Sequence, residues 1–349
     1  MVCSILNEED ELQYQQYVEN HPDASFEYSL DWRKIIQNNF GFIPSHVIYK
    51  DSEGKIKGIL PLFKAHSIFG TRLVAVPYAI YAGILADTEE AQTNIINFVK
   101  EMTLKSRLKF IEIREKDSGP IYPEFQKVSR VFNFSLQLSP DIDEVWKKLP
   151  KGSVRWGIKK AQNSGLTFTA GNSKSDLNHF YRLFLQTRKY RGVPSYPLSY
   201  FKDIANSFGK NVKIYTAFLG EKPLASIFLI YHKQEMRYAF AGTIHKQEYL
   251  KMQPYHLIFW EAIKDASSQG YNVFNLGGAA AATNEGGLYG FKKKWADEII
   301  SISSFYYLCQ DGKLPQTETA LLRCAAKAWS FLPLSLIRLL SPKVIKQFV

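Results

Sequence analysis

The feature that most constrains the fold of this chain is an αβ pattern that occurs twice. Residues 46–65 (HVIYKDSEGKIKGILPLFKA) and 212–231 (VKIYTAFLGEKPLASIFLIY) each contain two β-rich runs joined by a polar turn. The turn glycines, Gly54 and Gly220, lie 166 positions apart. Similar hairpins also arise by chance, so the elements that follow them must decide whether the pattern is a true repeat.

Those elements keep almost the same offset. A helical segment (92–108 and 255–271) leads into a short apolar strand in both halves, and Phe110 and Phe274 of these strands lie 164 positions apart. The agreement of hairpin, helix and strand predicts one αβ unit used twice. The predicted fold class is therefore α/β with mixed sheets, arranged as two tandem domains.

A chain of 349 residues is longer than one hydrophobic core usually serves. Residues 139–153 (SPDIDEVWKKLPKGS) carry two prolines and a glycine around a short amphipathic turn, which predicts a boundary near Pro150. We expect an N-terminal domain at 1–150, a catalytic domain at 151–312 and a basic amphipathic tail at 313–349.

The second half has the order helix, three strands, helix and two strands. Its first helix is predicted over 176–190, with Ser175 or Asp176 as the cap, because apolar residues recur there at helical spacing. The second helix is predicted from Pro254, since proline suits the first turn of a helix. The strands are predicted at 212–219, 224–231, 236–242, 272–277 and 300–308.

The charge balance favours polyanionic partners. The chain has 44 basic and 33 acidic residues, a net charge of +11 and a pI near 9.3. Nucleic acid, anionic lipid headgroups and a phosphorylated carrier all fit this charge, and its sign does not choose among them.

Several other classes of protein are disfavoured. The three cysteines, Cys3, Cys309 and Cys324, are too scattered for a disulfide framework, and the seven histidines are not paired at the spacing of metal ligands. No nucleophile elbow, Walker loop or zinc-protease motif occurs. The N-terminus has no signal-peptide pattern and no apolar run reaches the length of a membrane span, so we expect a cytoplasmic protein.

Four segments carry a resemblance to a known family. They are a basic helix KGSVRWGIKKAQNSGLTF (151–168), a turn FLQTRKYRGVPSYPLSYF (184–201), a strand and helix (236–263) and a late strand, loop and helix GYNVFNLGGAAAATNEGGLYGFKKKW (270–295). Together they resemble the Fem family of acyltransferases within the GNAT superfamily. The final residues, AKAWSFLPLSLIRLLSPKVIKQF, are similar to the ends of its exopolysaccharide-associated members.

The resemblance implies two tandem GNAT-like domains and transfer of an acyl or aminoacyl group to an amine of an exopolysaccharide or peptidoglycan precursor. The oxyanion would be stabilised by backbone N–H groups around Ala239–Thr243, with Lys292 adding charge. The candidate catalytic residues are Lys292, Tyr238 and His256. The candidate substrate-binding residues are Arg155, Lys159, Arg188, Arg191, Tyr255, Asn275 and Tyr289.

Two positions depart from the family pattern. The turn before the second helix, KMQPYHL, has neither the glycine nor the arginine with which CoA-dependent members hold a pyrophosphate. Asn275 stands where the family has an aspartate, so an acid role there is not expected.

Three functions remain open from the sequence. The chain is a Fem-like transferase with an aminoacyl-tRNA donor, an N-acyltransferase that uses acyl-CoA on an amino sugar, or a scaffold without turnover in a polysaccharide-assembly complex. No tightly bound cofactor is expected in any of them. The expected partners are a nucleotide-linked or lipid-linked glycan precursor and, for the first function, tRNA.

The tail carries basic residues between leucines and has no acidic residue after Glu318. Such a segment suits the interface of an anionic inner membrane, and it equally suits the cover of an exposed core. Pro333 and Pro342 are expected to prevent one long helix.

Overall fold

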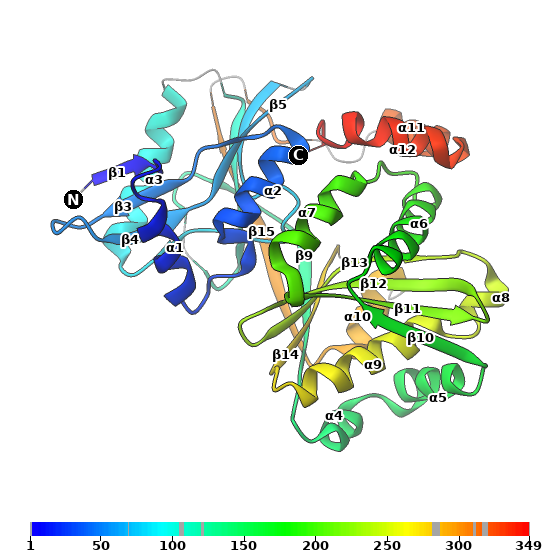
Figure 1. Ribbon diagram of the computed structural model, residues 1–349. Helices are drawn as coiled ribbons and strands as arrows, with labels where there is room; N and C mark the ends of the chain where they lie inside the picture. Colours follow the sequence, from blue (N-terminus) through cyan, green and yellow to red (C-terminus); the bar gives the residue numbers. More distant parts are fainter. Residues whose placement is uncertain are drawn as a thin grey trace. The chain divides into compact units, whose positions relative to one another are not determined.

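The computed structural model describes residues 2–68, 70–104, 108–119, 122–280, 287–309, 312–315 and 320–348 (Figure 1). The chain forms two compact units. The first comprises Met1–Val131, Ile300–Gln316 and Lys346–Val349, and the second comprises Phe132–Ile299 and Thr317–Ile345.

The division between the units lies at residues 131 and 132 and not near Pro150. Helix α4 (Ile142–Lys148) and the residue after it do not form a linker, because Val145 and Leu149 are buried in the hydrophobic core of the second unit. Because these apolar side chains are buried, the segment belongs to the second unit, although its prolines suggested a boundary.

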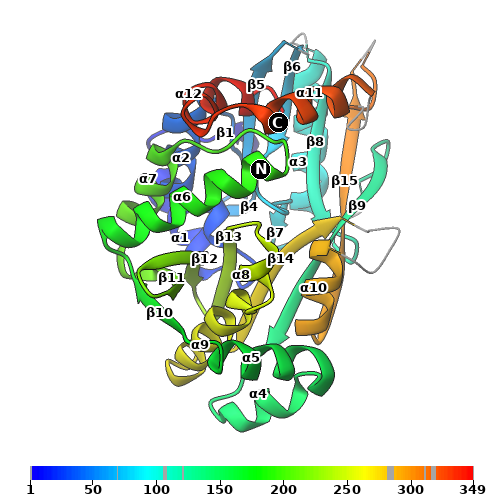
Figure 2. The same cartoon turned by 90° about the vertical axis from the view of Figure 1, so that its right-hand side faces the viewer.

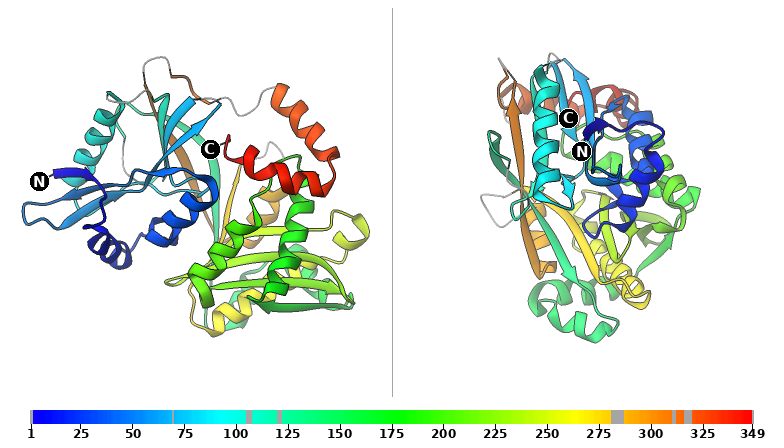
Figure 3. Two further views of the ribbon diagram at one scale, coloured as in Figure 1. Left: turned by 45° about the horizontal axis from the view of Figure 1, so that its top comes forward. Right: turned by 90° about the vertical axis from the view of Figure 1, so that its left-hand side faces the viewer.

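The first unit holds two groups of strands. The order β1-β3-β4-β7 is antiparallel throughout, and the second group has the order β15-β8-β6-β5-β2. Helix α3 packs on β3 and β4 (Figure 3). Its side chains Ile95 and Val99 are part of the hydrophobic core. The elements are β1 (Val2–Ile5), α1 (Glu11–Asn20), α2 (Leu30–Phe40), β2 (Ile43–Pro44), β3 (Val47–Lys50), β4 (Ile56–Leu60), β5 (Leu62–Ser67), β6 (Gly70–Ala75), β7 (Leu85–Ala86), α3 (Glu89–Leu104) and β8 (Phe110–Lys116), with β15 (Glu298–Leu308) added from late in the chain.

The second unit has the strand order β10-β11-β12-β13-β14-β9. Its elements are β9 (Gln126–Gln137, which begins in the first unit), α4, a π-helical turn (Lys151–Arg155), α5 (Trp156–Gln162), β10 (Leu166–Gly171), α6 (Lys174–Tyr190), α7 (Leu198–Phe208), β11 (Val212–Leu219), β12 (Lys222–His232), β13 (Glu235–Thr243), α8 (Gln247–Leu250), α9 (Pro254–Ser268), β14 (Val273–Ala280), α10 (Gly287–Trp295), α11 (Ala320–Phe331) and α12 (Leu334–Ile345).

Helices cover both faces of this second sheet (Figure 1). Phe228 of β12 contacts Phe180 of α6 and Phe201 of α7. Its neighbours Ile227 and Leu229 lie in the core cluster that α9 completes on the other side. Because successive side chains of a strand point to opposite faces, the fully apolar run of β12 is explained by burial on both sides.

The predicted duplication is visible in one repeated feature. A parallel pair joins β6 to β8 in the first unit, with Leu73 opposite Ile111. The same pair joins β13 to β14 in the second unit, with Glu235 opposite Val273. The paired positions are 38 residues apart in both cases, so each unit closes its parallel pair over a crossover of the same length.

Most predicted elements of the second unit agree with the structure, but the strand predicted at 300–308 pairs as β15 with β8 and belongs to the first unit. Helix α9 begins at Pro254 as expected, but α6 begins at Lys174. Its cap is Ser173, whose hydroxyl accepts from the backbone N–H of Asp176, while the Asp176 carboxylate accepts from the backbone of Ser173. The tail is not one long helix, as expected, because α11 ends before Pro333 and α12 begins after it; Pro342, in contrast, lies inside α12. Residues 281–286 of the predicted glycine-bearing loop lie outside the described residues.

The tail forms α11 and α12, which pack against α6 of the second unit. The hydroxyl oxygen of Ser341 accepts a 2.9 Å hydrogen bond from the backbone N–H of Ser195. Within the part of the chain that the structure describes, no helix is long and apolar enough to cross a membrane.

Helix α6 lies close to β13 only because residue 242 is glycine. A Cβ at Gly242 would lie 2.2 Å from the backbone nitrogen of Phe184. We expect Gly242→Ala to lower the free energy of unfolding by about 1–3 kcal/mol, the usual effect of overpacking. Gly152→Ala is the matched control, since nothing lies within 4 Å of its Cβ, and should change stability by less than about 0.5 kcal/mol. Urea titration measures both, and equal midpoints would contradict the expectation.

Candidate active site

The site begins where two parallel strands separate. Strands β13 and β14 pair only from Glu235 to Arg237 and from Val273 to Asn275, although both strands continue beyond these residues. On its other edge, β13 shifts register against β12, so that Tyr238 and Phe240 have partners and Ala239 is the additional residue. A bulge next to a separating strand turns backbone groups toward the space between the strands.

Lys292 of α10 spans this separation. Its side chain is only 4% exposed, and its Nζ donates a 2.8 Å hydrogen bond to the carbonyl oxygen of Gly278 on β14. The same Nζ lies 5.3 Å from the ring centroid of Tyr238 on β13. Helix α10 lies beside β14 (Figure 2). It can hold Lys292 there because Trp295 anchors it in the core.

The electrostatic environment of Lys292 is unusual for a lysine. Burial, and after it the positive charge of Arg191, lowers the pKa of Lys292 from 10.5 to about 7. Both protonation states are therefore populated near neutral pH. A group that exchanges a proton at the working pH of an enzyme suits acid–base chemistry.

Tyr238, Tyr255 and Arg191 complete the cluster. Burial raises the pKa of Tyr238, and the Arg191 charge opposes that rise. Burial followed by the neighbouring Tyr238 raises the pKa of Tyr255, again against Arg191. Both phenols stay protonated at neutral pH and are hydrogen-bond donors. The structure thus brings together four residues predicted from the sequence.

Three other predicted residues are occupied in packing or local structure. Asn275 is 2% exposed; its Nδ2 donates to Glu235 and its Oδ1 accepts from the backbone of Gly277. The ring of Tyr289 packs edge-on against two phenylalanines of β9. These contacts explain both residues without a ligand, and their predicted roles in substrate binding gain no support.

His256 also has a structural explanation. A Cβ at Gly157 would lie 2.5 Å from its ring, and the ring lies against Phe291 and Trp295. Burial, and then the charge of Lys294, lowers the pKa of His256 to about 4, so the imidazole is neutral at neutral pH. Tight packing on several sides favours a core role over that of a general base.

The predicted basic residues Arg155, Lys159 and Arg188 lie on different elements of the second unit. The guanidinium of Arg188 donates from both Nε and Nη2 to the carbonyl oxygen of Pro194, so it closes the turn after α6. Arg155 lies 5.8 Å from the ring of Trp146. Lys159 is exposed on α5. The charge of Arg188 is therefore used in hydrogen bonds inside the fold and that of Arg155 lies near an aromatic ring, whereas Lys159 faces solvent.

Sequence reasoning missed a stacked pair near Arg191. The rings of Tyr190 and His245 are 3.9 Å apart and nearly parallel at 6°, while His245 Nε2 lies 3.2 Å from the hydroxyl of Thr187. Tyr190 is 66% exposed, so its outer face is open to a flat ligand. No pattern in the sequence links these positions, because the pair forms only where α6 ends beside β13.

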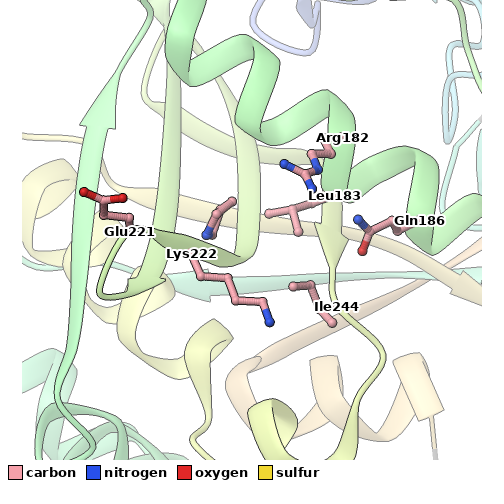
Figure 4. Close-up of a pocket in the computed structure, with 7 residues that line it drawn as sticks. Arg182, Leu183, Gln186, Glu221, Lys222 and Ile244 are labelled. Carbon is pink, nitrogen blue, oxygen red and sulfur yellow. The ribbon is translucent and has the colours of Figure 1, made fainter.

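A pocket of about 290 Å³ opens between α6 and the turn after β11 (Figure 4). Its lining combines basic and apolar side chains, with Arg182 and Lys222 projecting from opposite walls. Lys222 also donates to the hydroxyl of Tyr249 on α8. The pocket is lined by Arg182, Leu183, Gln186, Glu221, Lys222, Pro223 and Ile244.

The chain has recognisable relatives. Residues 151–293 match the acetyltransferase (GNAT) domain family. A UDP-N-acetylmuramoylpentapeptide-lysine N(6)-alanyltransferase of Weissella viridescens is 24% identical over 136 residues, which span 39% of this chain and only 40% of that relative.

Solved structures show the same fold over most of the chain. A crystal structure of FemX has a TM-score of 0.62 at 12% identity and covers 89% of this chain and 98% of its own. A tandem GNAT protein from the clavulanic acid biosynthesis pathway has a TM-score of 0.52 at 10% identity, covering 87% and 97%. These likenesses confirm the predicted fold of two tandem GNAT-like domains.

The buried lysine predicts a pH-dependent stability. The unfolded chain keeps the Lys292 proton up to about pH 10, whereas the folded chain releases it above about pH 7. Because the unfolded state then binds more protons, stability rises with pH through this interval, by roughly 1.4 kcal/mol per pH unit at most. Lys292→Met should remove this rise in urea titrations at pH 7, 8 and 9, while Lys294→Met, an exposed lysine on the same helix, should keep it.

The two arginines after α6 should behave differently. Arg188→Ala deletes two charged hydrogen bonds to Pro194 and should cost about 1.5–3 kcal/mol of folding free energy. Arg191→Ala removes an exposed side chain and should cost less than about 0.5 kcal/mol. Thermal unfolding of the two variants tests this assignment, which fails if their costs are equal.

Proposed function

We propose that this FemAB-like chain is an acyltransferase. The premise is that residues 151–293 match the acetyltransferase (GNAT) domain family. The protein transfers an acyl or aminoacyl group to an amine of a cell-envelope precursor. The observation that carries this proposal is Lys292, buried where β13 and β14 separate and titrating near neutral pH.

The proposed reaction uses groups on both sides of this separation. The neutral amine of the acceptor attacks the carbonyl carbon of the donor, a C–N bond forms, and negative charge moves to the carbonyl oxygen. Backbone N–H groups of Ala239–Thr243 and the ammonium of Lys292 stabilise that oxyanion. When the bond from carbon to the leaving oxygen or sulfur breaks, Lys292 protonates the leaving group and then takes up the proton released by the new amide nitrogen.

The acceptor is proposed to be a nucleotide-linked or lipid-linked precursor of peptidoglycan or exopolysaccharide. The name of the Weissella viridescens relative describes alanyl transfer to the lysine of a UDP-linked muramoyl pentapeptide, which supports a phosphorylated acceptor with a primary amine. Arg191 lies within electrostatic range of Lys292, and we propose that it binds an acceptor phosphate. Arg155 and Lys159 of the same domain are proposed as further phosphate ligands.

The donor is proposed to be an aminoacyl-tRNA, with acyl-CoA as the alternative. The net charge of +11 suits tRNA, and the exposed ring of Tyr190 offers a stacking surface for a base. Acyl-CoA is favoured by the GNAT domain itself and disfavoured by the segment before α9, which lacks the pyrophosphate-binding glycines. We place the reaction in the cytoplasm, with peripheral contact to the anionic inner membrane.

The decisive experiment compares Lys292→Met with Lys294→Met. Each protein is mixed with UDP-linked muramoyl pentapeptide and either alanyl-tRNA or acetyl-CoA, and the modified acceptor is quantified by mass spectrometry. We expect product with the wild type, a loss of about 10²–10³-fold in kcat for Lys292→Met, and wild-type kcat for Lys294→Met.

The pattern of substrates separates the remaining functions. A parallel reaction supplies acetyl-CoA and an amino sugar, and product from that pair alone would replace the proposal with an N-acyltransferase. Precursor binding without product from either donor would indicate the scaffold. Equal turnover by the two lysine variants would remove Lys292 from the mechanism.

A further inference from the structure

The last helix has apolar side chains on two opposite faces. The inner face of α12 is formed by Ile337, Ser341 and Ile345, which are all buried. Leu336, Leu339 and Leu340 recur at i, i+3 and i+4 on the other side and are 42%, 69% and 38% exposed. A helix that merely covered a core would carry polar residues at these outer positions.

Phe331 extends this apolar surface at the end of α11. Its side chain is 76% exposed, and it lies three residues before α12 begins. Four large apolar side chains are thus presented to solvent within ten residues of sequence, from Phe331 to Leu340. Single exposed leucines are ordinary, but such a group marks an interaction surface.

The charged side chains of α11 and α12 are all basic. No acidic residue follows Glu318 in the sequence, whereas Arg323, Lys327, Arg338 and Lys343 are exposed on the two helices. Basic residues interleaved with leucine and phenylalanine match the surface of an anionic bilayer. A second copy of this chain would present the same positive charge and fits less well.

The fold does not require the outer face. The helices are held on the second unit by their inner side, through the hydrogen bond from Ser195 to Ser341 and through Gly192, where a Cβ would lie 2.3 Å from the carbonyl oxygen of Ala326. The role of covering the unit is therefore filled by residues other than the exposed leucines.

We propose that the outer face of α11 and α12 is a docking surface for an anionic phospholipid bilayer. Phe331, Leu336, Leu339 and Leu340 enter the interface between headgroups and acyl chains. Arg323, Lys327, Arg338 and Lys343 lie at the level of the lipid phosphates. The two helices then lie flat on the membrane as a peripheral anchor.

This docking brings the active site to the membrane surface. Gly192 and Ser195, which hold the two helices, belong to the turn that directly follows Arg191. A bilayer bound to the outer face would therefore lie near the cationic end of the Lys292 cluster. The bilayer contact stands on the geometry alone, and its use for presenting a lipid-linked acceptor rests on the proposed function.

The test is co-sedimentation of the full chain with phosphatidylglycerol-containing vesicles and with pure phosphatidylcholine vesicles. We expect binding to the former, weakening with added salt, and little binding to the latter. The double variant Phe331→Ser/Leu339→Ser should lower the vesicle affinity by at least about tenfold, since it removes two large apolar side chains from the interface. The control Phe168→Ser/Ile299→Ser removes two exposed apolar side chains elsewhere on the second unit and should bind like the wild type.

Three outcomes would overturn the proposal. They are absence of binding to phosphatidylglycerol vesicles, equal affinity of the two double variants, and a dimer that the Phe331→Ser/Leu339→Ser change dissolves without any effect on vesicles. Turnover of a water-soluble nucleotide-linked acceptor should be unchanged in that variant. Loss of vesicle binding with intact turnover thus separates failure of the surface from failure of the proposed function.

Discussion

The candidate site depends on how briefly two parallel strands are paired. Hydrogen bonding between β13 and β14 is confined to three residue pairs, after which each strand needs other partners for its backbone groups. On β14, the carbonyl oxygen of Gly278 accepts a hydrogen bond from the ammonium of Lys292. On β13, the bulge at Ala239 changes the register of the strand against β12. If β13 and β14 stayed paired along their whole length, the carbonyl group of an acyl donor would have no space between them.

Burying the ammonium of Lys292 in that space costs free energy, and this penalty explains why the pKa of Lys292 is lowered. A buried ammonium loses its hydration, and one hydrogen bond to a carbonyl restores only part of it. The nearby positive charge of Arg191 raises the cost further and draws the pKa of Lys292 toward neutrality. The surrounding phenols of Tyr238 and Tyr255 stay protonated and do not neutralise it. Destabilisation of the charged lysine and its fitness for proton transfer therefore have the same physical origin.

The sequence predicted local structure well and tertiary roles only in part. The β-rich run at 212–219 predicted β11, and Pro254 predicted the start of α9, because both depend on local sequence. The two-fold repeat predicted the tandem architecture. The roles of Arg188 and Asn275 depend on Pro194 and Glu235, which lie opposite them only after folding. Likewise, nothing local shows that His256 lies beneath Gly157 or that Tyr190 stacks on His245. Lys292 was found because its helix keeps a family pattern, whereas its burial was visible only in three dimensions.

The pairing of β8 with β15 has a consequence for how the chain is made. Ile302 lies opposite Lys116, and the C-terminal Gln347 accepts hydrogen bonds from Ile68 and Arg72 of the first unit. On a ribosome, the first unit cannot complete its sheet until residues 132–299 of the second unit have been synthesised, because the paired residues of β15 follow them. The main segment of the second unit, Phe132–Ile299, is thus an insertion within the first unit, and it is synthesised while the first unit still lacks a strand. Loop-closure entropy then makes the joining of β15 to β8 a late step, which a prematurely terminated chain could never reach.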